Sequence, residues 1–152
     1  LEAAAHGVPA LAVSRETPIE YHNSYSDQVD FGVAAHFARL FARQALQNLP
    51  FPPDVDVLKI DIPATATPDT AWRFTRVSRQ SYHYGIPAAP EKRGIAVEGG
   101  YVTAIDKTVL EPDSDIWAIA VDQVISVSPL SFNLTSRVDF STLQERLNGH
   151  RP

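Results

Sequence analysis

The chain has 152 residues, contains neither cysteine nor methionine, and carries 13 Lys and Arg against 18 Asp and Glu, for a net charge of −5. The missing cysteines exclude disulfide bonds, thiolate metal sites and a cysteine nucleophile, and they agree with a cytoplasmic protein. The acidic balance gives no broad attraction to a nucleic acid duplex or an anionic membrane, and no apolar run is long enough to cross a bilayer. Hydrophobic residues make up 44% of the chain, which indicates a folded domain with a core.

The first 14 residues predict the end of a helix followed by a strand. Leu1 to His6 favour a helix, and Gly7 is the residue type that commonly ends one. Residues 8–14 are nearly all apolar without alternation, which is typical of a strand buried on both faces. This order is the second half of a β-α-β unit, so we expect the first strand of that unit to lie upstream of Leu1.

A polar segment, residues 15–30, follows this predicted strand. Proteins with parallel sheets bind ligands where the strands end. Ser14, Arg15 and the loop that runs to Asp27 are therefore candidates for a ligand site. A surface loop, with Ser14 as a hydrogen-bonding residue at the strand end, explains the same composition.

The next two elements complete an α/β portion over residues 1–63. Asp30 can cap a helix over residues 31–48, whose apolar face holds Phe37 and Phe41 with His36 at its boundary. A proline-rich segment ends that helix, and residues 55–62 then alternate between apolar and polar as a strand does.

Residues 64–152 predict a β-rich portion with a terminal helix. The glycine pair at 99–100 indicates a tight turn between two strands, and Ser114 or Asp115 can cap a short helix. The elements expected here, in chain order, are a strand over 72–79, a short edge strand over 81–85, a hairpin over 95–105, a helical turn over 116–121, a strand over 124–127 that Pro129 ends, and a helix over 139–148.

The common catalytic motifs are missing from the sequence. There is no phosphate-binding loop, no Gly-x-Gly-x-x-Gly and no Gly-x-Ser-x-Gly, and the five histidines are scattered. The acidic run 111–115 fits a solvated loop with a helix cap. Arginines at 73, 76 and 79 with aromatic neighbours could hold single-stranded nucleic acid, but a spacing of three does not place them on one strand face. A small hydrolase that uses Ser14 with His22 or His36 is a further alternative.

Four segments together resemble the survival protein E (SurE) family of metal-dependent nucleotide phosphatases. They share the family's order and spacing across nearly the whole chain. Lys59 and Asp61 stand where the family segment has asparagines, Ser128 replaces a threonine and Asn133 an aspartate. The segments are residues 2–14, Leu58-Lys59-Ile60-Asp61-Ile62-Pro63, Ser114-Asp115-Ile116-Trp117-Ala118-Ile119, and Val124 to Leu130 followed by Asn133-Leu134-Thr135.

This resemblance implies an α/β fold: part of a Rossmann-like three-layer core, then a β-hairpin-rich extension and a C-terminal helix that mediate assembly into a homodimer or homotetramer. It implies hydrolysis of nucleoside 5′(3′)-monophosphates with a divalent metal ion such as Mg²⁺ or Mn²⁺. The family carries its metal-binding residues ahead of the segment that matches Glu2, so the metal ligands are expected upstream of Leu1, and this chain holds no catalytic residue and no metal ligand.

The substrate-binding candidates within the chain are Ser14 and Arg15, because they end a core strand, and Asp115, because its segment matches the family. A helix cap explains Asp115 equally well. The alternative function is a non-catalytic oligomerisation or ligand-binding module.

Overall fold

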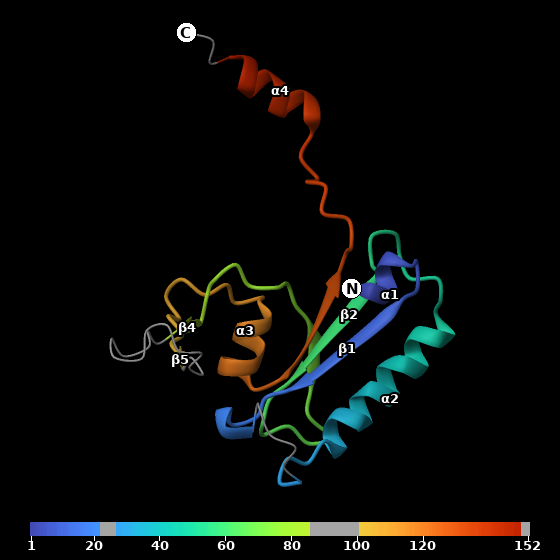
Figure 1. Ribbon diagram of the computed structural model, residues 1–152, viewed down its shortest axis with the longest axis vertical. Helices are drawn as coiled ribbons and strands as arrows, with labels where there is room; N and C mark the ends of the chain where they lie inside the picture. Colours follow the sequence, from blue (N-terminus) through green and yellow to red (C-terminus); the bar gives the residue numbers. More distant parts are fainter. Residues whose placement is uncertain (22–26, 86–100, 150–152) are drawn as a thin grey trace, which may run out of the picture.

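The computed structural model describes residues 1–21, 27–85 and 101–149. Within them a four-stranded mixed sheet carries helix α2 on one side and α3 with the β4–β5 hairpin on the other (Figure 1). The helical elements are α1 (Glu2–Ala5), η1 (Ile19–Tyr21), α2 (Gly32–Gln47), α3 (Asp115–Trp117), the π-helical segment η3 (Ala118–Asp122) and α4 (Phe140–Asn148). The strands are β1 (Ala10–Arg15), β2 (Val57–Ile62), β3 (Trp72–Phe74), β4 (His83–Gly85), β5 (Tyr101–Thr103) and β6 (Ile125–Leu130).

The sheet has the strand order β1-β2-β6-β3. β1 and β2 are parallel, with Ser14 opposite Asp61, whereas β2 and β6 are antiparallel, with Asp61 opposite Ser126. Strands from both predicted portions of the chain therefore share one sheet. The division at residue 63 stays a prediction.

The expectation that the first strand is buried on both faces is wrong for this structure. β1 is an edge strand of the described sheet, and its residues alternate between half-buried and exposed. Leu11 and Val13 pack against the core beneath α2, while Ala12 and Ser14 are exposed. The sequence of β1 shows no alternation because Ala12, which lies on the exposed face, is itself an apolar residue type.

The core lies between α2 and the sheet, as the helical spacing of apolar residues predicts. Phe37 and Phe41 of α2 are buried with Ile60 of β2 and Val127 of β6, and the two phenylalanine rings stack with centroids 6.4 Å apart. His36 is half-buried at the edge of this face, as expected. The helix begins at Gly32, one residue later than predicted, and its N-cap is Phe31 rather than Asp30, although the Asp30 carboxylate accepts the Gly32 N–H at 2.7 Å.

Two strands end at places that the sequence did not predict. β3 stops at Phe74 rather than Arg79, because the chain leaves β6 after Thr75 and the Arg76 backbone bonds Asp113 and Asp115 instead. The Thr75 hydroxyl lies within hydrogen-bond distance of the buried Ser126 and Ser128 hydroxyls, each at 2.8 Å. β6 continues past Pro129 to Leu130. The pairing of β6 with β3 ends at Val127, so the missing N–H of Pro129 leaves no strand partner unsatisfied.

The second sheet is a hairpin of β4 and β5, in which Tyr84 lies opposite Val102. The predicted edge over 81–85 and the second strand of the predicted hairpin therefore pair with each other. The predicted turn at residues 99–100 and the strand before it lie outside the described residues.

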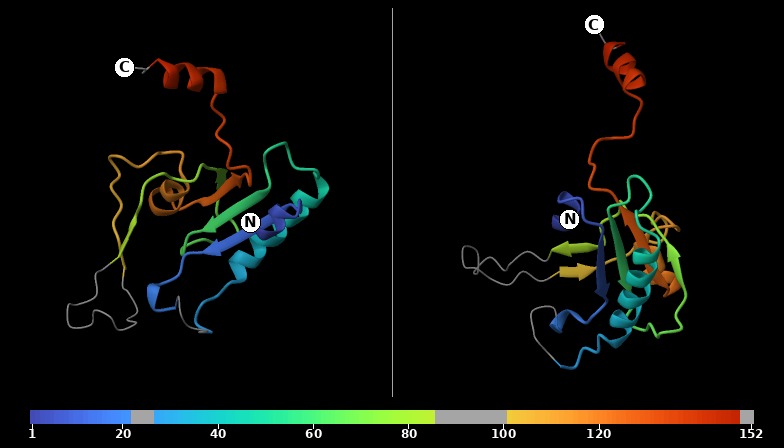
Figure 2. Two further views of the ribbon diagram at one scale, coloured as in Figure 1. Left: turned by 45° about the horizontal axis from the view of Figure 1, so that its top comes forward. Right: turned by 90° about the vertical axis from the view of Figure 1, so that its right-hand side faces the viewer.

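The C-terminal helix forms as predicted. Asp139 is its N-cap and accepts hydrogen bonds from the Ser141 hydroxyl and from the Thr142 N–H, the latter at 2.8 Å. These hydrogen bonds lower the pKa of Asp139 to about 2. Two further views show α4 standing away from the sheet at the end of an extended segment (Figure 2). None of its residues is buried.

Candidate functional site

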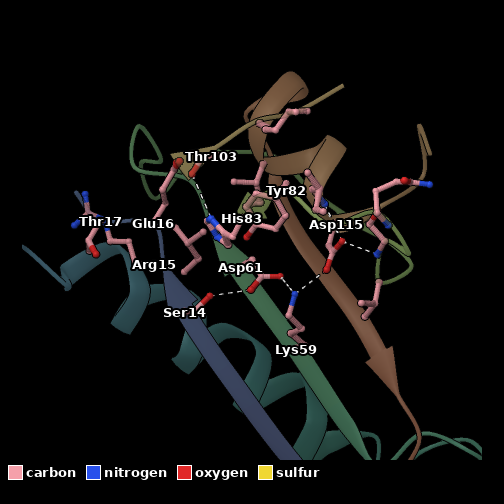
Figure 3. Close-up of a pocket in the computed structure, with 18 residues that line it drawn as sticks. Ser14, Arg15, Glu16, Thr17, Lys59, Asp61, Tyr82, His83, Thr103 and Asp115 are labelled. Carbon is pink, nitrogen blue, oxygen red and sulfur yellow. Dashed lines mark hydrogen bonds and ion pairs between the residues drawn. The ribbon is translucent and has the colours of Figure 1, made fainter. Parts of the chain in front are cut away.

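A pocket of about 590 Å³ lies where β1 and β2 end, between the sheet, α3 and the base of the hairpin. Ser14, Arg15 and Asp115, the three residues predicted to bind substrate, all line it (Figure 3). The pocket is therefore at the strand ends, where the sequence placed a ligand site. Their predicted role, contact with substrate, stays a prediction.

The floor of this pocket is a chain of four polar side chains, which we call the Lys59 network: Ser14, Lys59, Asp61 and Asp115. The Ser14 hydroxyl donates to Asp61 Oδ1 at 2.8 Å. Lys59 Nζ donates to Asp61 Oδ2 at 2.5 Å and to Asp115 Oδ2 at 2.8 Å. Strand register explains the grouping, because Ser14 pairs with Asp61 and Lys59 lies two residues earlier on the same face of β2.

Asp115 ties this network to the loop that leads to the hairpin. Its Oδ1 atom accepts the backbone N–H groups of Ser78 and Ile116 at 2.9 and 2.8 Å, while its other oxygen accepts from Lys59. Ser114, rather than Asp115, is the N-cap of α3, because its hydroxyl accepts the Trp117 N–H. The Asp115 carboxylate is buried and fully engaged, so its geometry fits a residue that positions its neighbours.

Arg15 stands in a different electrostatic situation from Lys59. Its guanidinium donates to the backbone carbonyl of Ala64 at 3.1 Å, and no carboxylate of the described residues lies within ion-pairing distance. Glu16 accepts the Ala64 N–H at 3.0 Å on the same connection. Arg15 is thus a positive charge that the backbone orients and no described carboxylate neutralises.

Charge and burial shift two pKa values in the pocket. Burial alone would lower the pKa of Lys59, but hydrogen bonds and charge interactions with Asp115 and Asp61 outweigh it, so its pKa is raised. Burial is also the main cause that raises the pKa of the half-buried Tyr82, although the Lys59 charge opposes it.

These two shifts predict loss of stability in alkali. A raised folded-state pKa adds stability that is complete below the unfolded value, 10.0 for tyrosine and 10.5 for lysine, and that disappears as the pH rises through the folded value. We expect urea midpoints to stay level up to about pH 10 and to fall above it. The fall should be smaller in Lys59→Met, measured over the same pH series; equal falls in both proteins would contradict this origin.

Several pocket residues were missed by sequence reasoning. Lys59 and Asp61 were noted only as departures from the family segment, although two polar residues at alternate positions near the end of an apolar strand are a signal. Tyr82 and His83 enter the pocket from the start of the hairpin, and no local pattern predicts that placement (Figure 3).

Other sequence candidates lie elsewhere. His36 is on α2, across the sheet from the pocket, so the structure does not bring it to Ser14; His22 lies outside the described residues. Arg73 and Arg76 form ion pairs with Asp122 and Asp113, which leaves them poorly placed to hold nucleic acid.

The described residues do not fit a metal ion. No group of three or more His, Asp or Glu among them could hold one. The two carboxylates that come nearest to a pair, Asp61 and Asp115, have the Lys59 ammonium between them.

Among the described residues, no helix is long and apolar enough to span a membrane.

Comparison with known proteins identifies the family. The family described as survival protein SurE matches residues 1–84, which is more than half of the chain. The match includes the pocket residues from Ser14 to His83, and the remaining pocket residues follow it in the chain. The chain belongs to the SurE family. The predicted resemblance is therefore confirmed, and with it a SurE-like α/β fold.

Curated members of the SurE family match over almost the whole chain. The 5′-nucleotidase SurE of Thermococcus gammatolerans is 34% identical over 98% of this chain and 55% of its own length. The 5′-nucleotidase SurE of Thermococcus kodakarensis is 31% identical over 97% of this chain and 56% of its own. The chain thus spans about half the length of these relatives.

A solved structure supports the same fold. The SurE protein from Aquifex aeolicus superposes with a TM-score of 0.56 at 19% identity, covering 97% of this chain and 54% of that one. At this identity the match speaks for the fold alone.

Proposed function

We propose that this chain is part of a metal-dependent phosphatase that hydrolyses nucleoside 5′(3′)-monophosphates, and that it supplies a substrate-facing wall rather than the metal site. The observation that carries the proposal is the position of the pocket. Its residues at the ends of β1 and β2 fall inside the segment that matches the SurE family, in a chain whose curated relatives are named 5′-nucleotidase.

The charges of the pocket agree with a site that another group completes. Arg15 and Lys59 stand against Glu16, Asp61 and Asp115, so two cations face three carboxylates and the lining has a net charge of −1. A phosphate monoester carries a charge of about −1.5 to −2 at neutral pH and would be repelled by this lining alone. A divalent cation would offset most of this combined negative charge, and the family resemblance places its ligands ahead of the segment that matches Glu2.

Within this proposal each predicted residue has a task that its contacts allow. Arg15, unmatched by a described carboxylate, is the side chain best suited to attract the phosphate. Ser14 and the rest of the Lys59 network shape the floor. Asp115 holds Lys59 and the Ser78 backbone in place.

The C-terminal helix supports the proposal that the protein is a homodimer or homotetramer. Its apolar side chains are exposed, with Phe140 at 65% and Leu147 at 71% of full accessibility. A helix that buries none of its residues on its own chain is suited to pack on a second copy. The cytoplasmic location stays a prediction.

A hydrolysis assay tests the proposed function. The protein expressed from its whole reading frame should release phosphate from AMP in the presence of Mg²⁺ or Mn²⁺, whereas the 152-residue chain alone should release at most a trace. Correct folding of the short chain, checked by circular dichroism, is the control. Strong turnover by the short chain, or none by the complete protein with any divalent metal, would contradict the proposal.

A further inference from the structure

The pocket floor offers hydrogen-bonding groups that are only partly used. Asp61 accepts from Ser14 and Lys59, one bond at each oxygen, yet a carboxylate has about four acceptor positions. Lys59 uses two of its three N–H donors, on Asp61 and Asp115. The Asp61 side chain is 18% exposed and that of Lys59 is 32% exposed, so both present unused capacity to the pocket.

The charge of this floor favours a neutral ligand group over a phosphate. Lys59 lies between two carboxylates, so the three side chains together carry a net charge of −1. A phosphate would meet repulsion there, whereas a hydroxyl group can donate to Asp61 and accept from Lys59 at the same time. Two neighbouring hydroxyls would use Asp61 and the Ser14 oxygen together.

The other lining residues of the pocket indicate which class of molecule would carry these hydroxyls. Val77, Ile105, Ile116 and Ile119 line the pocket with the half-buried Tyr82. Figure 3 places Tyr82 and His83 above Asp61. A pocket that combines a polar floor with apolar and aromatic lining residues is complementary to a nucleoside, whose sugar carries hydroxyls and whose base is flat and largely apolar on its faces.

We propose that Asp61, with Lys59 and Ser14, binds the 2′-hydroxyl of a ribonucleoside, together with the 3′-hydroxyl where it carries no phosphate, and that this floor makes the protein select ribonucleotides over 2′-deoxyribonucleotides. The selection between substrates during hydrolysis rests on the proposed function, whereas the binding of the ribose hydroxyls does not. An acidic side chain on a ribose 2′-hydroxyl is a recurrent device in nucleotide-binding folds. A site built to hydrogen-bond a hydroxyl discriminates against the analogue that lacks it, because its polar groups are then left unpaired.

Lys59 and Asp115 have different parts in this selection. Asp115 accepts three hydrogen bonds and its side chain is 8% exposed, so it is less available to a ligand than Asp61 and acts by positioning Lys59. Asp61 is the side chain that makes the direct contact. Selection should therefore depend on Asp61 most strongly.

Two readouts on the complete protein test the inference, one of them independent of hydrolysis. The first is the ratio of kcat/KM for AMP and dAMP with Mn²⁺ present. The second is the ratio of Kd for adenosine and 2′-deoxyadenosine, measured by calorimetry. We expect both ratios to favour the ribose form by about tenfold or more, the factor that one hydrogen bond to a charged group supplies.

Variants at Asp61 locate the effect. Asp61→Ala should bring both ratios close to one by weakening the ribose form about tenfold more than the deoxyribose form. Asp61→Asn, which keeps an acceptor for Ser14 and for a hydroxyl, should restore part of the preference. Asp69→Ala, at an exposed position outside the pocket, is the matched control and should leave the ratios unchanged.

The outcomes separate this inference from the proposed function. A preference for adenosine that depends on Asp61, in a protein that hydrolyses no nucleotide, would support the ribose site and sink the phosphatase. Hydrolysis of AMP and dAMP at equal efficiency, or an Asp61→Ala variant that loses both substrates equally, would overturn the ribose site and leave the phosphatase standing.

Discussion

Replacement of Asp115 by asparagine is expected to lower the free energy of unfolding by roughly 2 to 4 kcal/mol, the cost of breaking a buried, hydrogen-bonded ion pair reduced for the partial exposure of its lysine. Asp115 is 6% exposed as a whole residue, and its carboxylate accepts from the Ser78 and Ile116 N–H groups and from Lys59. The asparagine side chain has an acceptor oxygen at one position and an NH₂ donor at the other. Its NH₂ group would therefore face either the Lys59 ammonium or the backbone N–H groups of Ser78 and Ile116, which are donors themselves. Urea denaturation followed by tryptophan fluorescence measures the change.

Asp113→Asn is the matched control for that measurement. Asp113 lies two residues away and pairs with Arg76 at the surface, where its side chain is 58% exposed. Exposed pairs contribute at most about 1 kcal/mol, so this variant should unfold close to the wild type. Equal urea midpoints for the two variants would show that Asp115 is not the tie between β2, α3 and the Ser78 loop.

Replacement of Phe37 by alanine is expected to cost about 3 to 5 kcal/mol of stability, because it removes a large buried ring and leaves a cavity. Phe37 is 2% exposed and lies at the centre of the contact between α2 and the sheet. It stacks on Phe41, which in turn contacts Trp72 edge-to-face at 5.2 Å. The free energy of unfolding from thermal or urea denaturation measures the loss.

Phe31→Ala removes the same ring at a position that is 57% exposed, just before α2. Its expected effect is within about 0.5 kcal/mol, the usual range for surface substitutions. Equal free energies of unfolding for the Phe37→Ala and Phe31→Ala proteins would contradict the placement of the core beneath α2.

Local patterns in the sequence predicted the elements that depend on local interactions. The apolar spacing of Phe37 and Phe41 identified α2 and its buried face, and a helix was expected over residues 139–148, where α4 forms. What failed depends on neighbours in space. β6 passes through Pro129 because its pairing with β3 ends at Val127 while its pairing with β2 runs on to Leu130. β3 ends because the Arg76 backbone bonds the distant Asp113 and Asp115 instead of β6.

The candidate site was predicted in part for the same reason. Ser14 and Arg15 were found from position alone, since strand ends are where α/β proteins bind ligands. Asp61 and Lys59 became site residues only when the register placed Ser14 opposite Asp61 and the fold brought Asp115 to Lys59. Contacts between residues 56 positions apart cannot be seen in local periodicity.

The pocket also explains why a family phosphatase motif is hard to find in this chain. Its described residues supply a net negative floor, a backbone-held Arg15 and an apolar wall, but no set of ligands for a metal ion. In the proposed function, these parts bind and orient a substrate. The group that neutralises and activates the phosphate is assigned, in this account, to residues outside the chain.

Phosphate release from AMP by the complete protein, before and after removal of divalent metal, tests this account most directly. A chelator should reduce release to background, added Mn²⁺ or Mg²⁺ should restore it, and the 152-residue chain should show no metal-dependent release under the same conditions. Undiminished release after chelation, or metal-restored release by the 152-residue chain alone, would contradict it.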